Sequence, residues 1–436
     1  MYRRLSVFLL GSTSLVSYGT PLVGPGAPAL LDQCRMHLML DPRTGTVQAH
    51  GTWQVRVVSL PTKLQFLLAP GLVVQTVRGP QIDAFAQQPG TRNGDTLTIS
   101  LRPAERGETS IRFYLVYAGR VAASPLPQAI HSWSAPWLEL TERFAMVPLR
   151  CRAPLAQRTT YALHVQLPVG YNLIGPGRVR HPRARTWTLR QPATRQLGLF
   201  GAPDLAMWRA PSPSGLAVRV VQAGGVDSSG QCLGTLAGRA ATFYNAQYGV
   251  RHLRQLCLVV PPRSAQVASQ TWSYAVPGDY HRSLVRVEPG GNAEQTFYTI
   301  GHEVAHHWWH ASPYPNSQFQ SYLNEGFAEY ACLCFYRATY GEAAFASLLA
   351  RYRVLAETLP PVSQMAPDLP LKTRNQFIYV KAAYTLYLLE RQLGQSAMRQ
   401  LLRQAAREQP ASHTAWLALV ERSAGRPARL FFEAHF

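Results

Sequence analysis

Alternation of apolar and polar residues dominates the first half of the 436-residue chain. Leu97, Ile99 and Leu101 occupy every second position, and the apolar residues of segments 111–117 and 161–167 are spaced in the same way. This period of two is typical of strands that bury one face. No long helical period interrupts the region, so the pattern predicts an all-β, sandwich-like domain over residues 30–205.

The pattern changes after a stretch rich in proline and serine at 210–215, where we place a domain boundary. Beyond it we expect strands and one helix in the order 216–221, 233–248 (helix), 256–260 and 283–287. From residue 292 onward apolar residues recur every three or four positions, as they do in helices. The sequence therefore predicts a second, mostly helical domain over residues 216–436 and an α+β multidomain fold.

The helix expected over 292–308 carries the sequence His302-Glu303-Val304-Ala305-His306. Two imidazoles four residues apart project from one side of a helix, which suits two ligands of a tetrahedral zinc ion. Glu303 can then face the water on the metal. The motif also arises by chance on ordinary helices, so the interpretation depends on a further ligand.

Glu325 is the candidate for that ligand, because eighteen residues separate it from His306 and it lies near the start of a second expected helix. Three protein ligands leave one position open on the metal, as in catalytic rather than structural zinc sites. Nitrogen-rich ligation also favours zinc over other divalent ions. We therefore predict one Zn²⁺ per chain, held by His302, His306 and Glu325.

The motif, the interval and the string Asn-Glu-Gly-Phe-Ala-Glu-Tyr around Glu325 resemble the gluzincin metallopeptidases of the M1 aminopeptidase family. Tyr379 and Lys381, in Tyr-Val-Lys-Ala, are similar to the family's Tyr-x-Lys-Gly/Ala segment. The resemblance implies a thermolysin-like second domain, peptide substrates, Glu303 as general base and Tyr379 as oxyanion donor. The alternative for Tyr379 is a core aromatic residue on a helix.

The chain departs from this family in its amine-binding segment. Family aminopeptidases carry Gly-x-Met-Glu-Asn upstream of the zinc motif, and its glutamate binds the free amino group of the substrate. No methionine occurs between Met207 and Met365, and the corresponding stretch is 272–278. Asp279 is the nearest carboxylate, and a Pro-Gly-Asp turn explains it better than amine binding does. The C-terminal part is also too short for the large helical domain of longer members.

The expected activity is zinc-dependent peptide hydrolysis, with removal of N-terminal residues preferred by the resemblance. Two alternatives stay open because the amine-binding glutamate is missing. One is an endopeptidase or another zinc hydrolase that needs no free amine. The other is a non-catalytic binding protein that keeps the fold. The sequence does not indicate the oligomeric state.

Charge adds a second feature to this picture. Lysine and arginine number 43 against 23 aspartates and glutamates, for a net charge of +20. A basic surface attracts nucleic acids, cell-surface polymers or acidic substrates, and arginines that merely solvate the surface are the alternative. No nucleic-acid-binding module is recognisable, so we predict no specific nucleic-acid partner.

Residues 1–19 have the features of a signal peptide: a basic start, an apolar stretch over 5–16 and small residues at the cleavage spacing. They predict export to the periplasm or the extracellular space, with a cytoplasmic location as the alternative. No later stretch is long enough for a transmembrane segment. The six cysteines would allow disulfides in an exported chain, although their pairing does not follow from the sequence.

Overall fold

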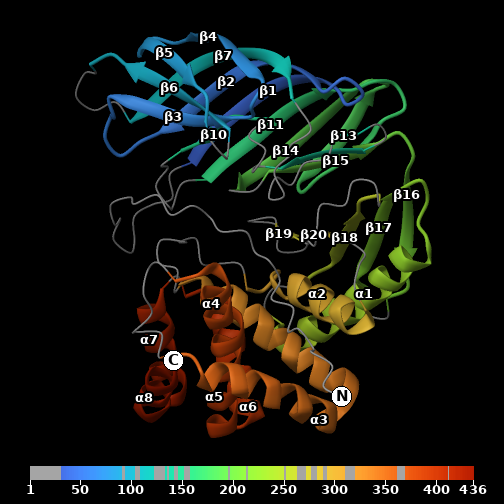
Figure 1. Cartoon of the computed structure of the whole chain (residues 1–436), viewed down its shortest axis with the longest axis vertical. Coiled ribbons are helices and arrows are strands. Elements are labelled where there is room, and N and C mark those ends of the chain that lie inside the picture. Colours follow the sequence, from blue (N-terminus) through green and yellow to red (C-terminus); the bar gives the residue numbers. More distant parts are fainter. Residues whose placement is uncertain are drawn as a thin grey trace.

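The computed structural model describes residues 31–90, 94–103, 109–121, 133–134, 137–141, 146–151, 158–194, 197–212, 215–249, 252–262, 272–275, 282–287, 292–309, 320–360, 369–410 and 412–436. The predicted signal peptide at 1–19 and Asp279 lie outside these residues. In Figure 1, β layers in blue and green stand above helices in orange and red, and a smaller green and yellow sheet lies along one side. The predicted α+β order, a β-rich part followed by a mostly helical part, is confirmed.

The β-rich part is built on a seven-stranded sheet with the order β13-β14-β11-β1-β2-β7-β4. Its strands are β1 (Leu31–Asp41), β2 (Thr46–Arg56), β4 (Leu72–Arg78), β7 (Ser110–Arg120), β11 (Arg158–Gln166), β13 (Arg178–Arg183) and β14 (Thr186–Thr194). In this sheet β1 and β11 pair in parallel, and the other neighbouring strands in the described part of the chain pair antiparallel. Along β1 the side chains alternate, so Cys34 and Met36 are buried while Arg35 and His37 are exposed.

Two four-stranded sheets cover the inner face of the large sheet. One has the order β10-β3-β6-β5 and the other β12-β15-β9-β8. Their strands are β3 (Lys63–Leu68), β5 (Ile82–Gln88), β6 (Asp95–Leu101), β8 (Trp133–Ser134), β9 (Trp137–Thr141), β10 (Leu149–Arg150), β12 (Asn172–Ile174) and β15 (Gly198–Ala202). The apolar side chains of the three sheets form one core, in which the rings of Trp53 and Phe66 are 5.2 Å apart. The other face of the large sheet points away from this core.

A five-stranded sheet with the order β16-β17-β18-β20-β19 links the β-rich part to the helices. Its strands are β16 (Leu205–Ala210), β17 (Ala217–Ala223), β18 (Gln255–Val260), β19 (Trp272–Ala275) and β20 (Arg282–Arg286). The stretch 210–215 connects β16 with β17, which pair with each other, so the five-stranded sheet begins before this stretch, at Leu205. The residue limits of the two domains stay a prediction. A buried ion pair between Glu139 of β9 and Arg286 of β20 joins two of the sheets.

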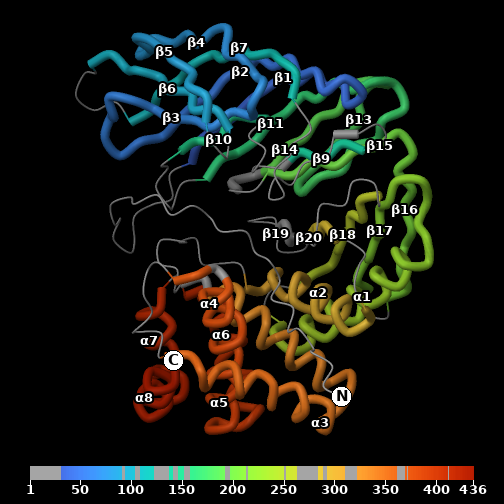
Figure 2. Tube along the Cα trace, in the orientation of Figure 1, coloured from blue at the N-terminus to red at the C-terminus, as the bar shows by residue number. Residues whose placement is uncertain are grey.

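The helical part begins with α1 (Ser228–Tyr248), which connects the parallel strands β17 and β18. It continues with α2 (Ala293–Ala305), η3 (Gln320–Leu323), α3 (Glu325–Glu357), α4 (Leu371–Asn375), the π-helical segment η5 (Gln376–Lys381), α5 (Ala382–Leu393), α6 (Gln395–Glu408), α7 (His413–Ala424) and α8 (Arg426–His435). Figure 2 follows the chain from the five-stranded sheet into these helices. None of the helices in the described part of the chain has the length and apolar character needed to cross a membrane.

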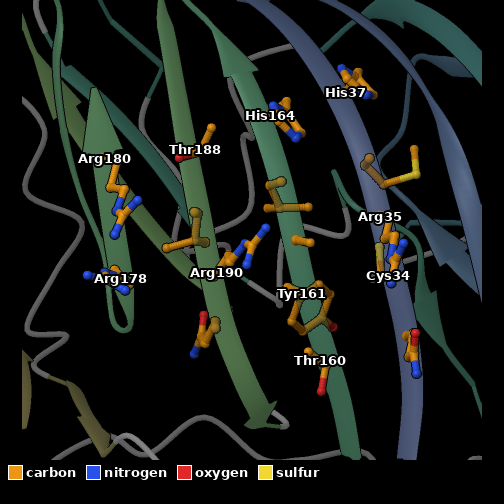
Figure 3. A pocket seen from close by; sticks show the side chains of 16 residues that line it. Cys34, Arg35, His37, Thr160, Tyr161, His164, Arg178, Arg180, Thr188 and Arg190 are labelled. Carbon is orange, nitrogen blue, oxygen red and sulfur yellow. The ribbon is translucent and has the colours of Figure 1, made fainter. Parts of the chain in front are cut away.

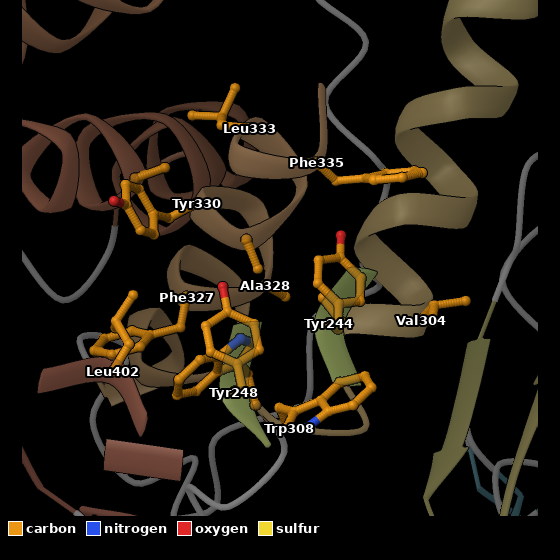
Figure 4. Close-up of a cluster of buried hydrophobic side chains, with 14 of the residues drawn as sticks. Tyr244, Tyr248, Val304, Trp308, Phe327, Ala328, Tyr330, Leu333, Phe335 and Leu402 are labelled. Carbon is orange, nitrogen blue, oxygen red and sulfur yellow. The ribbon is translucent and has the colours of Figure 1, made fainter. Parts of the chain in front are cut away.

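Packing between α1, α2 and α3 fixes the position of α2. The ring of Tyr244 is 5.5 Å from that of Trp308 and 5.9 Å from that of Phe335 (Figure 4). The Tyr244 hydroxyl also donates a hydrogen bond of 2.9 Å to the carbonyl oxygen of Gly301. A Cβ atom on Gly301 would lie 2.7 Å from the sulfur of Cys332, so only glycine allows this close approach of α2 to α3. All six cysteines are described, and no disulfide joins them.

Candidate metal centre

Helix α2 presents both histidines of the predicted motif. Asn292 and Gln295 cap its start with reciprocal hydrogen bonds of 2.8 and 2.9 Å. The helix ends at Ala305, three residues earlier than expected, and His306 is its C-terminal cap. The rings of His302 and His306 still lie on one side, with their centres 4.7 Å apart. The pair of imidazoles is therefore built by the last turn of a well-capped helix.

Glu325 is the first residue of α3, and the structure brings its carboxylate to both histidines. One carboxylate oxygen is 3.1 Å from Nε2 of His302 and 3.3 Å from Nε2 of His306. The three ligand atoms lie within 4.8 Å of one another. Two ligands of a tetrahedral zinc with bonds of about 2.0–2.1 Å are separated by roughly 3.3–3.4 Å. The spacing of these atoms therefore fits a zinc ion.

The other nitrogen of each histidine determines what Nε2 can do. Nδ1 of His302 is 2.8 Å from a carboxylate oxygen of Glu329, and Nδ1 of His306 is 3.0 Å from the carbonyl oxygen of Trp309. Both oxygens only accept hydrogen bonds, so each Nδ1 must carry a proton and donate it. In a neutral imidazole, Nε2 then carries a lone pair. Two nitrogen lone pairs and one carboxylate oxygen therefore converge, a donor set that fits a cation.

The electrostatics of the cluster favour positive charge at the same place. Burial alone would lower the pKa of His302, but hydrogen bonds to Glu325 and Glu329 outweigh it and raise the pKa to about 10. Burial would raise the pKa of Glu325, yet the charges of His306 and His302 hold it well below its usual range. The protein thus stabilises a proton between these groups when no metal is bound. A divalent cation would take the place of that proton.

Glu303 and Tyr379, the two predicted catalytic residues, both border this cluster. Glu303 is 8% exposed. Its carboxylate, together with that of Glu325, raises the pKa of His306 against the lowering effect of burial. Tyr379 is 5% exposed, and its ring centre is 5.6 Å from that of His302. A carboxylate and a phenol therefore lie beside the three candidate ligands.

Local backbone structure holds Tyr379 at this position. It lies in η5, and single π-helical turns inserted into longer helices often occur at functional sites. A Cβ atom on Gly326 would lie 2.5 Å from Cβ of Ala382 and 2.9 Å from the carbonyl oxygen of Ile378. Glycine at the start of α3 therefore lets the helix that carries Glu325 approach the segment that carries Tyr379.

Glu329 and Lys381 also make hydrogen bonds near the cluster, and the sequence predicted no such contacts for either residue. Glu329 follows Glu325 by one helical turn and also accepts a hydrogen bond from the Tyr352 hydroxyl. Its spacing of four residues from a candidate ligand is a signal that could have revealed it. The ammonium of Lys381 donates bonds of 2.9 Å to the carbonyl oxygens of Leu359 and Pro360. Nothing in the sequence indicates these backbone acceptors.

Comparison with protein-family models and with curated proteins finds no match for this chain. Solved structures do match. An M1 zinc metallopeptidase from Deinococcus radiodurans is 20% identical with a TM-score of 0.67, over 94% of this chain and 93% of that one. A mutant of it, bound to a Tyr-Ser-Ala substrate, has a TM-score of 0.65. Native yeast LTA4 hydrolase is 14% identical with a TM-score of 0.65, over 93% of this chain and 66% of that one. The chain therefore has the fold of these M1 zinc metallopeptidases.

Proposed function

We propose that this chain, which shares the M1 metallopeptidase fold, is a zinc-dependent peptidase whose metal is held by His302, His306 and Glu325. The convergence of two imidazole lone pairs and one carboxylate oxygen carries this proposal. The fold supports it, because similar structures are those of zinc peptidases. A non-catalytic role is disfavoured, since Glu303 and Tyr379 both lie beside the candidate ligands.

The chain's own residues supply the remaining chemistry of peptide hydrolysis. When bound, zinc is a Lewis acid that polarises a carbonyl group and lowers the pKa of water. Glu303 accepts a proton from the attacking water and later delivers it to the departing amine. The Tyr379 hydroxyl donates a hydrogen bond to the carbonyl oxygen as negative charge develops there. The burial of both side chains keeps these groups in a low-dielectric environment, where such interactions are strongest.

We further propose that the enzyme removes N-terminal residues from peptides. The similar mutant structure from Deinococcus radiodurans is bound to a Tyr-Ser-Ala substrate, and two further similar structures of a two-domain M1 zinc metallopeptidase mutant are bound to L-arginine and to L-tryptophan. A second candidate activity, hydrolysis without recognition of a free amine, is favoured by one observation. The stretch that replaces the family's amine-binding segment begins with β19, and none of its residues Trp272–Ala275 is a carboxylate.

A pair of matched substrates tests these proposals. Purified protein, stripped of metal and reloaded with Zn²⁺, is given an aminoacyl arylamide and its N-acetylated counterpart, and zinc content is measured in parallel. We expect one zinc per chain and cleavage of the free-amine substrate only. Equal cleavage of both substrates would favour the second candidate. Zinc binding without any cleavage, also of longer peptides, would favour a binding protein.

The substitution Glu303→Gln distinguishes the role of the general base from that of the metal ligands. The amide keeps the shape of the side chain but cannot accept the proton, so turnover should fall by about 10²–10⁴ with zinc retained. Glu294→Gln, in the first turn of the same helix and partly exposed, is the matched control and should keep its activity. Full activity in Glu303→Gln would refute the assignment of the base.

A further inference from the structure

The face of the seven-stranded sheet that points away from the core contains a hollow of about 780 Å³. Residues from β1, β11, β13 and β14 line it (Figure 3). The titratable side chains that reach its exposed side are all basic, and together we call them the basic groove: Arg35, His37, His164, Arg178, Arg180 and Arg190. No aspartate or glutamate is among the described residues that line it.

Strand register arranges these side chains in two rows across the sheet. Arg178 is paired with Arg190, which is followed by Ala162 and then by Arg35. In the next row Arg180 is followed by Thr188, His164, His37 and His50. Neighbours within a row are about 4.8 Å apart and the rows are roughly 6.6 Å apart, as the geometry of a sheet dictates. The cationic groups are therefore distributed over four strands rather than gathered at one point.

No acidic side chain among the described residues balances the charge of the groove arginines. All four are exposed, and none has an ion pair with another described residue. By contrast Arg422 pairs with Glu408 at 2.7 Å, and Arg429 pairs with Glu421 at 2.6 Å. Like charges placed side by side without counter-charges destabilise a sheet. Such an arrangement is explained when an anionic ligand supplies the counter-charge.

We propose that the basic groove binds a flexible linear phosphate polymer without nucleobases. Guanidinium groups match phosphate oxygens with two parallel hydrogen bonds, and several of them spaced over four strands suit a chain with repeated charges. The hollow accommodates a chain better than it would a flat membrane surface. This binding site is separate from the metal centre and does not depend on the proposed peptidase activity.

Two observations disfavour single-stranded nucleic acid as the occupant. Proteins that bind it use exposed aromatic rings on which the bases stack. The tyrosine that lines the groove, Tyr161, is only 3% exposed, and the exposed Tyr114 lies beside His50, outside the residues that line the groove. The ring of His37 is stacked between those of His50 and His164, with centres 5.0 and 4.6 Å away, so both of its faces are already covered.

Fluorescence anisotropy with labelled inorganic polyphosphate tests the proposal on the full chain. The groove variant is Arg35→Glu, Arg178→Glu and Arg190→Glu. The control variant is Arg239→Glu, Arg391→Glu and Arg407→Glu, which changes the net charge by the same amount on exposed arginines of α1, α5 and α6. We expect the groove variant to bind about 100-fold more weakly. The slope of log K against the logarithm of the salt concentration should also be smaller in magnitude by roughly two to three. The control should stay within about threefold of the parent.

Equal losses in the two variants would show that binding follows net charge, and would overturn the site. Thermal unfolding shows whether the glutamate variant is folded. If it is not, a milder variant with glutamine at the same three groove positions takes its place. The glutamine variant should lose a large part of the affinity. Oligo-dT or polyglutamate binding more tightly than polyphosphate would overturn the choice of polymer, and so would binding only to anionic vesicles.

Discussion

Histidines gather in two regions of this molecule, and their neighbours give them opposite properties. At the metal centre, carboxylates and a carbonyl oxygen surround His302 and His306, and the pKa of each is raised. In the basic groove, burial and the neighbouring rings of His164 and His50 lower the pKa of His37. The same side chain is thus oriented as a metal ligand in one place and held as a neutral stacked ring in the other.

This difference shows that the candidate metal site is defined by hydrogen-bond acceptors next to the histidines, and not by the histidines alone. In the groove the rings of His37 and His164 are nearly parallel, at an interplanar angle of 10°, and no carboxylate is among the residues that line it. At the metal centre, the Nδ1 atoms are held by Glu329 and by the carbonyl oxygen of Trp309. Changing these partners should therefore alter metal binding or turnover and leave the groove unaffected.

Apart from loss of the proposed base Glu303, the largest effect is expected at the phenol beside the metal centre. Tyr379→Phe removes the proposed donor to the oxyanion, and loss of one such donor lowers kcat by about 10²–10³. Zinc content and polyphosphate affinity should not change, because the ring remains in place against His302. Tyr384→Phe, one turn further along the same helical stretch, is the control and should keep the parent rate. Steady-state kinetics on an aminoacyl arylamide measures kcat for both variants. An unaltered kcat in Tyr379→Phe would show that Tyr379 contributes to packing and not to catalysis.

A smaller effect is expected at the carboxylate that holds His302. Glu329→Gln replaces a charged acceptor with a neutral one, and changes of this kind weaken metal affinity by about 10–100-fold. Competition with a fluorescent chelator measures the zinc dissociation constant. Glu357→Gln, on the exposed part of the same helix, should leave that constant as it is. If the two variants bound zinc equally well, the proposal that Glu329 orients His302 for metal binding would be wrong.

The candidate ligands could be predicted because the information is local. His302 and His306 are separated by one helical turn, and Glu325 is placed by a short string of residues at a fixed interval. The partner of His306 could not be predicted in this way. The carbonyl oxygen of Trp309 is available only because α2 ends at Ala305, and every residue except proline carries the same backbone groups.

Strand order was the part of the fold that the alternating pattern could not supply. Alternation predicted strands at 97–101, 111–117 and 161–167, and β6, β7 and β11 lie there. It contains no information on which strands pair, because a period of two is the same in every register. The row of His37, His50 and His164 depends entirely on that pairing, since β1 lies between β2 and a parallel β11. The basic groove could therefore be found only in three dimensions.

The smallest predicted effect tests whether the stacked histidines add charge to the groove. Because burial and the neighbouring rings of His164 and His50 lower the pKa of His37, its ring gains a proton at a lower pH than an unperturbed histidine does. A bound polyanion favours the protonated form, so affinity for polyphosphate should rise as the pH falls from 7.5 to 5.5. Arginines of the groove and one tyrosine are the other titratable groups near these rings: Arg35, Arg180 and Tyr114.

Arginine and tyrosine side chains ordinarily titrate far above pH 7.5, so we assign any pH-dependent difference that is specific to the groove to its histidines. We expect a gain of roughly tenfold or less, because protonation of one ring opposes protonation of the next. Replacing His37 with glutamine should remove most of that gain without weakening binding at pH 7.5, and anisotropy titrations at the two pH values measure it. A gain that persists in full would mean that the stacked rings take no part in binding, and that the arginines alone define the groove.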